Sequence, residues 1–167
     1  MAIKTNKSAI VWGELVISIF RLNALFMTLG NKIARPAGQT SARWFVLAAS
    51  YLVPQTVSQI ARRMGVTRQG IQRTADQLVK EGLVVFRENE AHKRSRLIEL
   101  TEKGKLAMES IAKEQGRWAA KWSKHIEEAN LSQVLESLHR IEKICRSTRP
   151  EPTIARFASG EKRRVRR

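Results

Sequence analysis

The chain reads TVSQIARRMGVTRQGIQRTADQLVKEGL over residues 56–83, and this stretch decides the fold. Two apolar sets recur there at spacings of three and four, which predicts two short amphipathic helices. The sets are Val57, Ile60, Ala61 and Met64, then Ile71, Ala75, Leu78 and Val79. Gly65 separates them, where a left-handed backbone ends a helix at little cost. Thr56 with Gln59 has the pattern of a capping box, and Thr67 suits the cap of the second helix.

The outer face of the second helix is polar and basic. Arginine and amide side chains on one face match the donors and acceptors at base edges in the DNA major groove. A helix-turn-helix that places its second helix in that groove is therefore our interpretation; an ordinary helical hairpin in a core is the alternative. The candidate contacts to bases or nearby phosphates are Arg68, Gln69, Gln72, Arg73 and Gln77, and the candidate phosphate contacts are Thr56, Ser58 and Thr67.

A β-hairpin, or wing, is predicted after these helices. Residues 83–87 and 96–100 are rich in strand-forming side chains, and the segment 88–95 between them is polar. Gly82 precedes the hairpin as a second left-handed stop, and Thr101 follows it as the cap of a new helix. Such a hairpin holds a basic tip beside the second helix. Its basic side chains join the candidate DNA contacts: Lys93, Arg94 and Arg96.

This order of elements resembles the MarR (multiple antibiotic resistance regulator) family of winged-helix transcription factors. The resemblance is carried by QLVKEGLV at 77–84 and by KRSRLIELTEKG at 93–104, which combines a basic pair, an apolar strand and Leu-Thr-x-x-Gly. It extends over about residues 8–147. It implies that Arg94 enters the minor groove. The family usually has an aspartate two residues before that arginine, but here the residue is His92; the wing tip is then looser, or held by Glu88 or Glu90.

The fold class expected from these patterns is mainly α with a small β-hairpin. The chain is divided into a winged helix-turn-helix region at 40–103 and a helical dimerisation region at 8–34 and 104–147. Pro36, Gly38 and Pro54 separate the first helices, and a later break is expected near Asn130. The helices outside residues 56–83 are expected at 8–33, 41–52, 102–128 and 131–146.

The first of these helices is apolar on more than one side. A surface helix of a monomer needs a single apolar stripe, and the resemblance implies that such helices interlace between two subunits. We therefore expect a homodimer that binds double-stranded DNA. Two helix-turn-helix units related by a twofold axis read half-sites about one DNA turn apart, roughly 34 Å, so the expected target is an imperfect inverted repeat.

The composition is strongly basic. The chain has 31 lysine and arginine residues against 15 acidic residues, a formal net charge of +16, and such a surface attracts polyanions. Charge alone also suits a general nucleic-acid-binding protein, nucleoid- or RNA-associated, which remains the alternative function. The tail at 149–167 ends in KRRVRR and has few apolar residues, which predicts disorder; it is either a solubilising end or a non-specific nucleic-acid arm.

The sequence suggests neither export nor a membrane span. Residues 9–20 form an apolar run, but Glu14 interrupts it and Arg21 ends it, short of the ~20 residues that a bilayer requires. The single cysteine, Cys145, excludes an internal disulfide and suits the cytoplasm. We therefore expect a cytoplasmic, nucleoid-associated protein. Cys145 itself is either a small apolar filler, or a redox switch or an intersubunit disulfide.

No constellation of residues indicates an enzyme, and no cofactor is expected. The one aspartate, Asp76, lies in the second helix of the helix-turn-helix, and there is no phosphate-binding loop. Solvated or core histidines are expected at His125 and His139, with a zinc or copper site that includes Glu127 and Glu128 as the alternative.

The MarR resemblance also implies a small-molecule effector of unknown identity, bound in a crevice between the dimer helices and the winged unit. Trp12, Trp44 and Phe45 are candidates to line it, or are simply core residues. An effector of this kind acts by favouring a spacing of the two second helices that does not match the DNA.

Overall fold

The computed structural model of the chain describes residues 6–92 and 94–148. The expectations for Lys93 and for the tail at 149–167 lie outside the described residues. The chain divides into two compact units, Met1–Ala119 and Ala120–Arg167.

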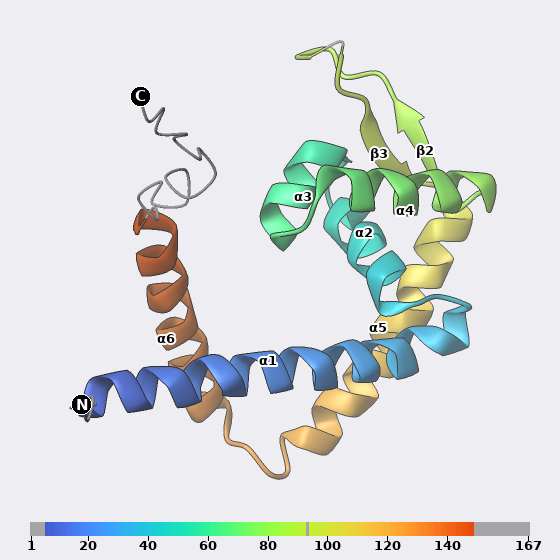
Figure 1. Cartoon of the computed structure of the whole chain (residues 1–167). Coiled ribbons are helices and arrows are strands. Elements are labelled where there is room, and N and C mark those ends of the chain that lie inside the picture. Colours follow the sequence, from blue (N-terminus) through green and yellow to red (C-terminus); the bar gives the residue numbers. More distant parts are fainter. Residues whose placement is uncertain (1–5, 93, 149–167) are drawn as a thin grey trace, which may run out of the picture. The chain divides into compact units, whose positions relative to one another are not determined.

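The elements confirm the mainly helical class with a small antiparallel sheet (Figure 1). In Figure 1 the β2–β3 hairpin extends beyond α4, and α3 lies beside α4. In order, the elements are α1 (Lys7–Ala34), the 3-10 turn η1 (Arg35–Ala37), α2 (Ser41–Tyr51), β1 (Gln55–Thr56), α3 (Val57–Met64), α4 (Arg68–Lys80), β2 (Val84–Arg87), β3 (Leu97–Leu100), α5 (Glu102–Trp122) and α6 (Glu128–Ser147).

The sheet has a strand that the sequence did not predict. Its order is β1-β3-β2 with antiparallel pairing, in which Thr56 lies opposite Leu97 and Phe86 lies opposite Ile98. β1 is only two residues long, which is too short to give an alternating pattern. Its effect is to join the start of α3 to the base of the wing.

The predicted helix ends of the helix-turn-helix are confirmed. The Thr56 hydroxyl accepts a hydrogen bond from the backbone N–H of Gln59, and the Gln59 side chain accepts one from the N–H of Thr56. Gly65 has a φ of 65°, a left-handed value that ends α3. The Thr67 hydroxyl accepts from the N–H of Gly70 at 3.1 Å and so begins α4. Local side chains thus fix where both helices start.

The core of the first unit lies beneath α4 and the sheet. Ile60, Leu78 and Ile98 are fully buried, and α2 packs against α4 and β3. Val79 belongs to the apolar set from which an inward-facing side of this helix is expected, but that expectation is wrong for Val79, because it is 37% exposed. The buried positions of α4 are Ile71, Ala75 and Leu78.

The end of α4 is joined to the start of α5 through three successive carbonyls. Lys103 Nζ donates to the carbonyl of Glu81 at 2.8 Å, and the Thr101 hydroxyl donates to that of Gly82 at 2.7 Å. The N–H of Thr101 donates to the carbonyl of Leu83 at 3.1 Å. The Thr101 hydroxyl also accepts from the N–H of Gly104 at 3.1 Å, which confirms it as the cap of α5.

Helix α1 exposes a large apolar surface within its unit. Phe20 is 72% exposed and Leu25 is 65% exposed. By length and composition, α1 with the turn after it (Lys7–Ala37) could cross a membrane: its most apolar 18-residue stretch has a mean hydropathy of 1.6, and none of that stretch is buried. One such helix is weak evidence, because core helices and signal sequences pass the same test. The expectation that Arg21 ends the apolar run is nevertheless wrong, since the run continues beyond it.

In the second unit, α6 is also exposed along its apolar side. The expected break near Asn130 lies earlier, at 123–127, where the N–H groups of His125 and Ile126 bond the carbonyl of Trp122. Cys145 is exposed, so it is not a filler within this unit. The exposed apolar residues of α6 are Leu131, Val134, Leu135, Leu138 and Ile144.

Candidate nucleic-acid interface

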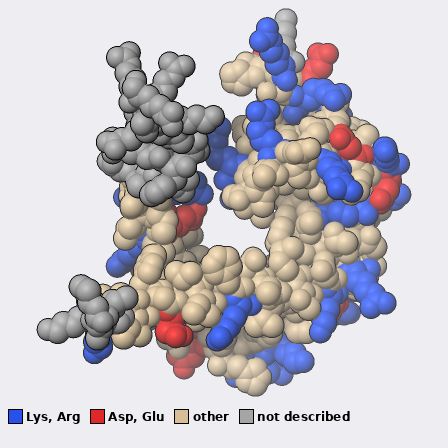
Figure 2. Space-filling view, viewed as in Figure 1, with Lys and Arg blue, Asp and Glu red and all other residues tan. Residues whose placement is uncertain are grey.

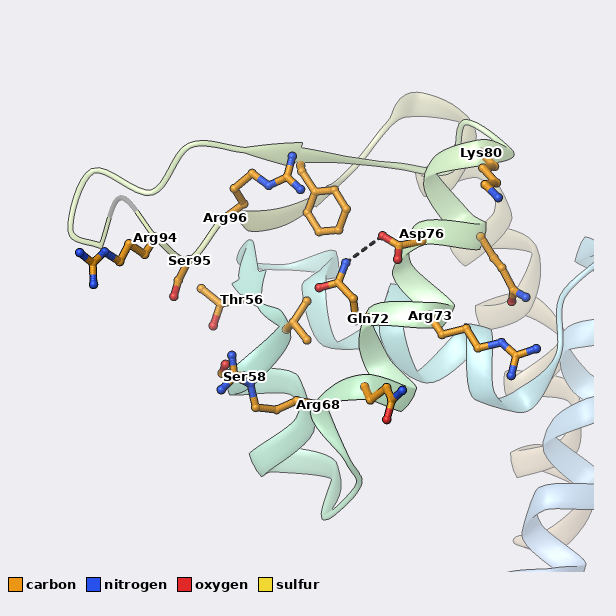
Figure 3. Close-up of a pocket in the computed structure, with 14 residues that line it drawn as sticks. Thr56, Ser58, Arg68, Gln72, Arg73, Asp76, Lys80, Arg94, Ser95 and Arg96 are labelled. Carbon is orange, nitrogen blue, oxygen red and sulfur yellow. Dashed lines mark hydrogen bonds between the residues drawn. The ribbon is translucent and has the colours of Figure 1, made fainter.

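A groove of about 890 Å³ lies between α4 and the wing (Figure 3). The start of α3, the outer face of α4, strand β2 and the second half of the wing contribute its walls. The structure therefore brings together side chains that are up to 40 positions apart in the sequence, from Thr56 to Arg96. Nine of the expected contacts line this groove: Thr56, Ser58, Arg68, Gln69, Gln72, Arg73, Gln77, Arg94 and Arg96.

Thr67 does not line the groove. Its hydroxyl is used by the N–H of Gly70 at the start of α4, so its role in this structure is to position the helix. A Cβ at position 70 would lie 3.1 Å from the Thr67 hydroxyl oxygen, which would have to shift by a few tenths of an ångström.

Some lining residues were not among the expected contacts. Lys80 lies seven positions after Arg73 and three after Gln77, so the helical spacing was sufficient to place it on the same face. Phe86 had no such signal, since the facing of a short strand depends on its register. The additional lining residues are Val57, Asp76, Lys80, Phe86 and Ser95.

The groove is basic, with a single acidic side chain. Figure 2 shows lysine and arginine side chains outnumbering acidic ones over the winged part of the first unit. A basic concave surface attracts polyanions and concentrates them at that surface. Asp76 is the one acidic residue of the lining, and the basic residues are Arg68, Arg73, Lys80, Arg94 and Arg96.

The wing arginine nearest the sheet is held by an aromatic ring. The Arg96 guanidinium carbon lies 4.4 Å from the centroid of the Phe86 ring, a cation–π contact of about 0.5–1 kcal/mol at an exposed site. Arg87 Nε and Glu99 Oε2 form an ion pair of 2.6 Å between the strands. These contacts give the base of the wing a defined shape.

Asn89 shapes the wing tip. Its carbonyl accepts from the N–H of His92 at 3.0 Å, and its Oδ1 accepts from the N–H of Ala91 at 3.2 Å. In the described part of the wing these bonds come from Asn89, and whether the tip is looser or is held by Glu88 or Glu90 stays a prediction. The family usually has an aspartate near the tip of the wing. Here the hydrogen bonds of a local turn at Asn89 shape the tip.

An ion pair fixes the end of α4 to α2. The guanidinium of Arg43, which is 17% exposed, bonds the carboxylate of Glu81, which is 47% exposed. The hydrogen bond from Arg43 holds the pKa of Glu81 below its usual value, and the charges of Arg43 and Lys103 act in the same direction. The orientation of the groove-facing helix is thus set from both α2 and α5.

Glu81→Gln is expected to lower the free energy of unfolding by about 0.2–1 kcal/mol at pH 7, because the pair is partly exposed. A carboxylate with a lowered pKa stabilises the fold above its unfolded-state pKa, and that contribution is lost as the pH falls through the folded-state pKa. The difference between the two proteins should therefore shrink below pH 4.5, the ordinary value for this group. Urea unfolding at pH 7 and pH 4 measures it. Glu109→Gln is the control, because it removes an exposed acid from α5. If the difference in unfolding free energy between the wild type and Glu81→Gln did not depend on pH, the lowered pKa of Glu81 would be contradicted.

The candidate effector residues do not belong to the groove. Trp44 and Phe45 are half-buried, with stacked rings whose centroids lie 6.2 Å apart, and Trp12 is 49% exposed on α1. His125 and His139 are exposed. Among residues 6–92 and 94–148, no group of three or more potential metal ligands comes together.

The chain matches known proteins over this region. A family model described as "MarR family" matches residues 37–95. The Mycobacterium tuberculosis protein Rv2011c is 36% identical over 137 residues, which are 82% of this chain and 96% of that protein.

Solved structures share the fold at lower identity. BldR from Sulfolobus solfataricus, a transcriptional regulator, has a TM-score of 0.73 at 20% identity and covers 83% of this chain and 99% of its own. The M. tuberculosis transcriptional regulator MosR, in complex with DNA, has a TM-score of 0.64 at 24% identity, covering 78% and 97%. CouR from Rhodococcus jostii, bound to p-coumaroyl-CoA, has a TM-score of 0.69 at 21% identity, covering 76% and 90%.

The helix-turn-helix with its wing, the basic groove between them and the match to the family model agree with one another. The family and its fold are those of transcription regulators, not of enzymes. The chain belongs to the MarR family of transcription regulators and has their winged-helix fold.

Proposed function

We propose that this chain binds an imperfect inverted repeat in double-stranded DNA as a homodimer and regulates transcription in response to a signal. The observation that carries the proposal is the groove that gathers nine of the expected DNA contacts. Its amide side chains, such as Gln72 and Gln77, can both donate and accept hydrogen bonds at base edges, which favours sequence-specific reading over general binding.

The exposed apolar surface of α1 supports the homodimer. Lys7, Glu14 and Arg21 recur every seven residues along the helix, and such a polar stripe is typical of a helix that packs against another helix with one side in water. A bilayer is a poorer partner, since a charge such as Glu14 or Arg21 near its centre costs about 2.5–3.5 kcal/mol on insertion scales. We therefore assign the apolar surface to a second copy of the chain and place the protein in the cytoplasm.

Light scattering at micromolar concentration should give about twice the chain mass of 19.0 kDa. Phe20→Asp is expected to shift the mass toward that of the monomer, because it places a charge on the apolar surface of α1. Leu52→Asp is the matched control, because Leu52 is 87% exposed but lies on the segment after α2. The Leu52→Asp protein should have the same mass as the wild type. A wild-type protein with the mass of one chain would contradict the homodimer.

Selection of bound fragments from random duplex DNA tests the proposal as a whole. A sequence-specific dimer should recover an inverted repeat and prefer it over bulk DNA by ~10³-fold or more at physiological salt. Recovery of unrelated sequences with equal affinity would instead favour the general nucleic-acid-binding alternative, to which the net charge of +16 is also suited.

The signal in this proposal is a small molecule. CouR shares the fold and was solved with p-coumaroyl-CoA, and the half-buried Trp44 and Phe45 offer aromatic surface near the start of α2. A ligand releases DNA only if it binds more tightly to a conformation that does not fit the operator. Loss of operator binding on addition of such a ligand, with no change in the mass of the dimer, is the expected result.

A further inference from the structure

We propose that Gln72 and Asp76 act as one unit that selects a base with an amino group in the major groove, adenine or cytosine, in each half of the operator. The inference rests on the proposed function, because it concerns what the groove reads once α4 lies in the major groove. Both side chains line the groove and both are exposed one turn apart on α4.

The orientation of the Gln72 amide is fixed by Asp76. Gln72 Nε2 donates to Asp76 Oδ1 at 2.8 Å, and in Figure 3 the amide oxygen of Gln72 points away from Asp76. A carboxylate can only accept hydrogen bonds, so it holds the NH₂ end of the amide toward itself. The ambiguity of a free glutamine, which can turn either end toward a base, is removed.

The atoms that remain available on the pair are mostly acceptors. Gln72 keeps its oxygen and one N–H, and Asp76 keeps its second oxygen and the charge. In the described part of the chain, the ion pairs of lysine and arginine residues go to carboxylates other than that of Asp76. The groove therefore contains one negatively charged acceptor site among five basic side chains.

Base chemistry converts this arrangement into a preference. In the major groove, adenine presents its N6 amino group and cytosine its N4 amino group, whereas guanine and thymine present the acceptors O6 and O4. An acceptor pair bonds the amino group and meets an unfavourable contact with the keto oxygen. The same carboxylate repels phosphates, so the pair lowers affinity for DNA in general while it raises discrimination.

The less specific explanation is that the pair only stabilises α4. Glutamine and aspartate four residues apart are known to support a helix, and that role would be the same with or without DNA. The two explanations differ in one measurable property, which is the identity of the bases selected. They also differ in the affinity for unrelated DNA. Loss of the carboxylate should raise that affinity if the pair reads bases, and should leave it unchanged if the pair only stabilises the helix.

Binding-site selection with the full-length wild-type protein and with Asp76→Asn tests the inference. Asparagine can still accept the Gln72 hydrogen bond but lacks the charge and adds a donor. At one position in each half-site, we expect discrimination of adenine or cytosine against guanine or thymine to fall by about 5- to 150-fold. We also expect tighter binding of Asp76→Asn to unrelated duplex DNA.

Gln72→Ala and a modified operator complete the test. Gln72→Ala should weaken discrimination at the same position. If adenine is selected, it is replaced in the operator with purine, which lacks the amino group. This should weaken operator binding by the wild type but not by Asp76→Asn. If cytosine is selected, 2-pyrimidinone replaces it for the same purpose. Glu109→Gln is the matched control, since it removes an exposed acid from α5 outside the groove.

The outcomes separate the inference from the proposed function. If the wild type recovers an inverted repeat and Asp76→Asn recovers the same bases with equal discrimination, the inference is wrong and the proposed function stands. If the wild type prefers guanine or thymine at every position affected by the variants, the inference is also overturned. If the wild type recovers no preferred sequence, both fail.

Discussion

Gly104→Ala is expected to lower the free energy of unfolding of the first unit by about 2–4 kcal/mol, which exceeds the usual effect of a single substitution. An added Cβ would lie 2.1 Å from the carbonyl oxygen of Leu83 and 3.1 Å from its carbonyl carbon. Both atoms are backbone, and the oxygen is already bonded by the N–H of Thr101. No side-chain rotation can relieve this overlap, so α5 must move away from the end of α4.

Gly116→Ala in the same helix is the control for this substitution. A Cβ at position 116 meets no atom within 4 Å, and alanine in a helix interior stabilises by about 0.5–1 kcal/mol relative to glycine. The two variants should therefore shift urea unfolding in opposite directions, measured by circular dichroism at one protein concentration. Equal midpoints for Gly104→Ala and the wild type would show that the joint between α4 and α5 is looser than described.

In the proposed homodimer, Arg94→Ala is expected to weaken operator binding by about 100-fold or more, because each subunit loses one charge-assisted contact. Each groove contains five basic residues, so a dimer presents enough of them for ~6–10 phosphates, and wild-type affinity should fall ~10³–10⁵-fold between 50 and 200 mM salt. Loss of Arg94 from both subunits should reduce the slope of log affinity against log salt by about two.

Fluorescence anisotropy with a labelled operator, repeated over that range of salt, measures both quantities. Arg117→Ala provides a control with the same change in charge: Arg117 pairs with Glu114 on α5 and is absent from the groove. It should leave the salt slope almost unaltered. An Arg94→Ala protein with wild-type affinity would remove the wing from the binding mechanism.

Local chemistry explains why much of the fold was predictable. Thr56, Gly65, Thr67 and Gly82 act on their immediate neighbours, so their capping and stopping roles follow from a few positions of sequence. What could not be predicted depends on distant partners. β1 exists only because Gln55 and Thr56 pair with β3, about 40 residues later in the chain.

The candidate site shows the same division. The residues on the outer face of α4 could be predicted from the helical period, and Lys80 could have been predicted in the same way. The cation–π contact between Arg96 and Phe86 was not predictable, since it depends on the register of the wing strands. The ion pair between Arg43 and Glu81 joins residues 38 positions apart and left no trace in local spacing.

Three carbonyls after α4 accept hydrogen bonds from residues at the start of α5, and these bonds make the joint between α4 and α5 rigid. Lys103 and Thr101 bond three consecutive carbonyls at residues 81–83, directly after α4, so we expect a tilt of the first turn of α5 to be passed to the end of α4. The wing begins immediately after this joint, so we expect it to move with the end of α4. We therefore expect a change in the direction of the first turn of α5 to shift the end of α4 and the base of the wing together.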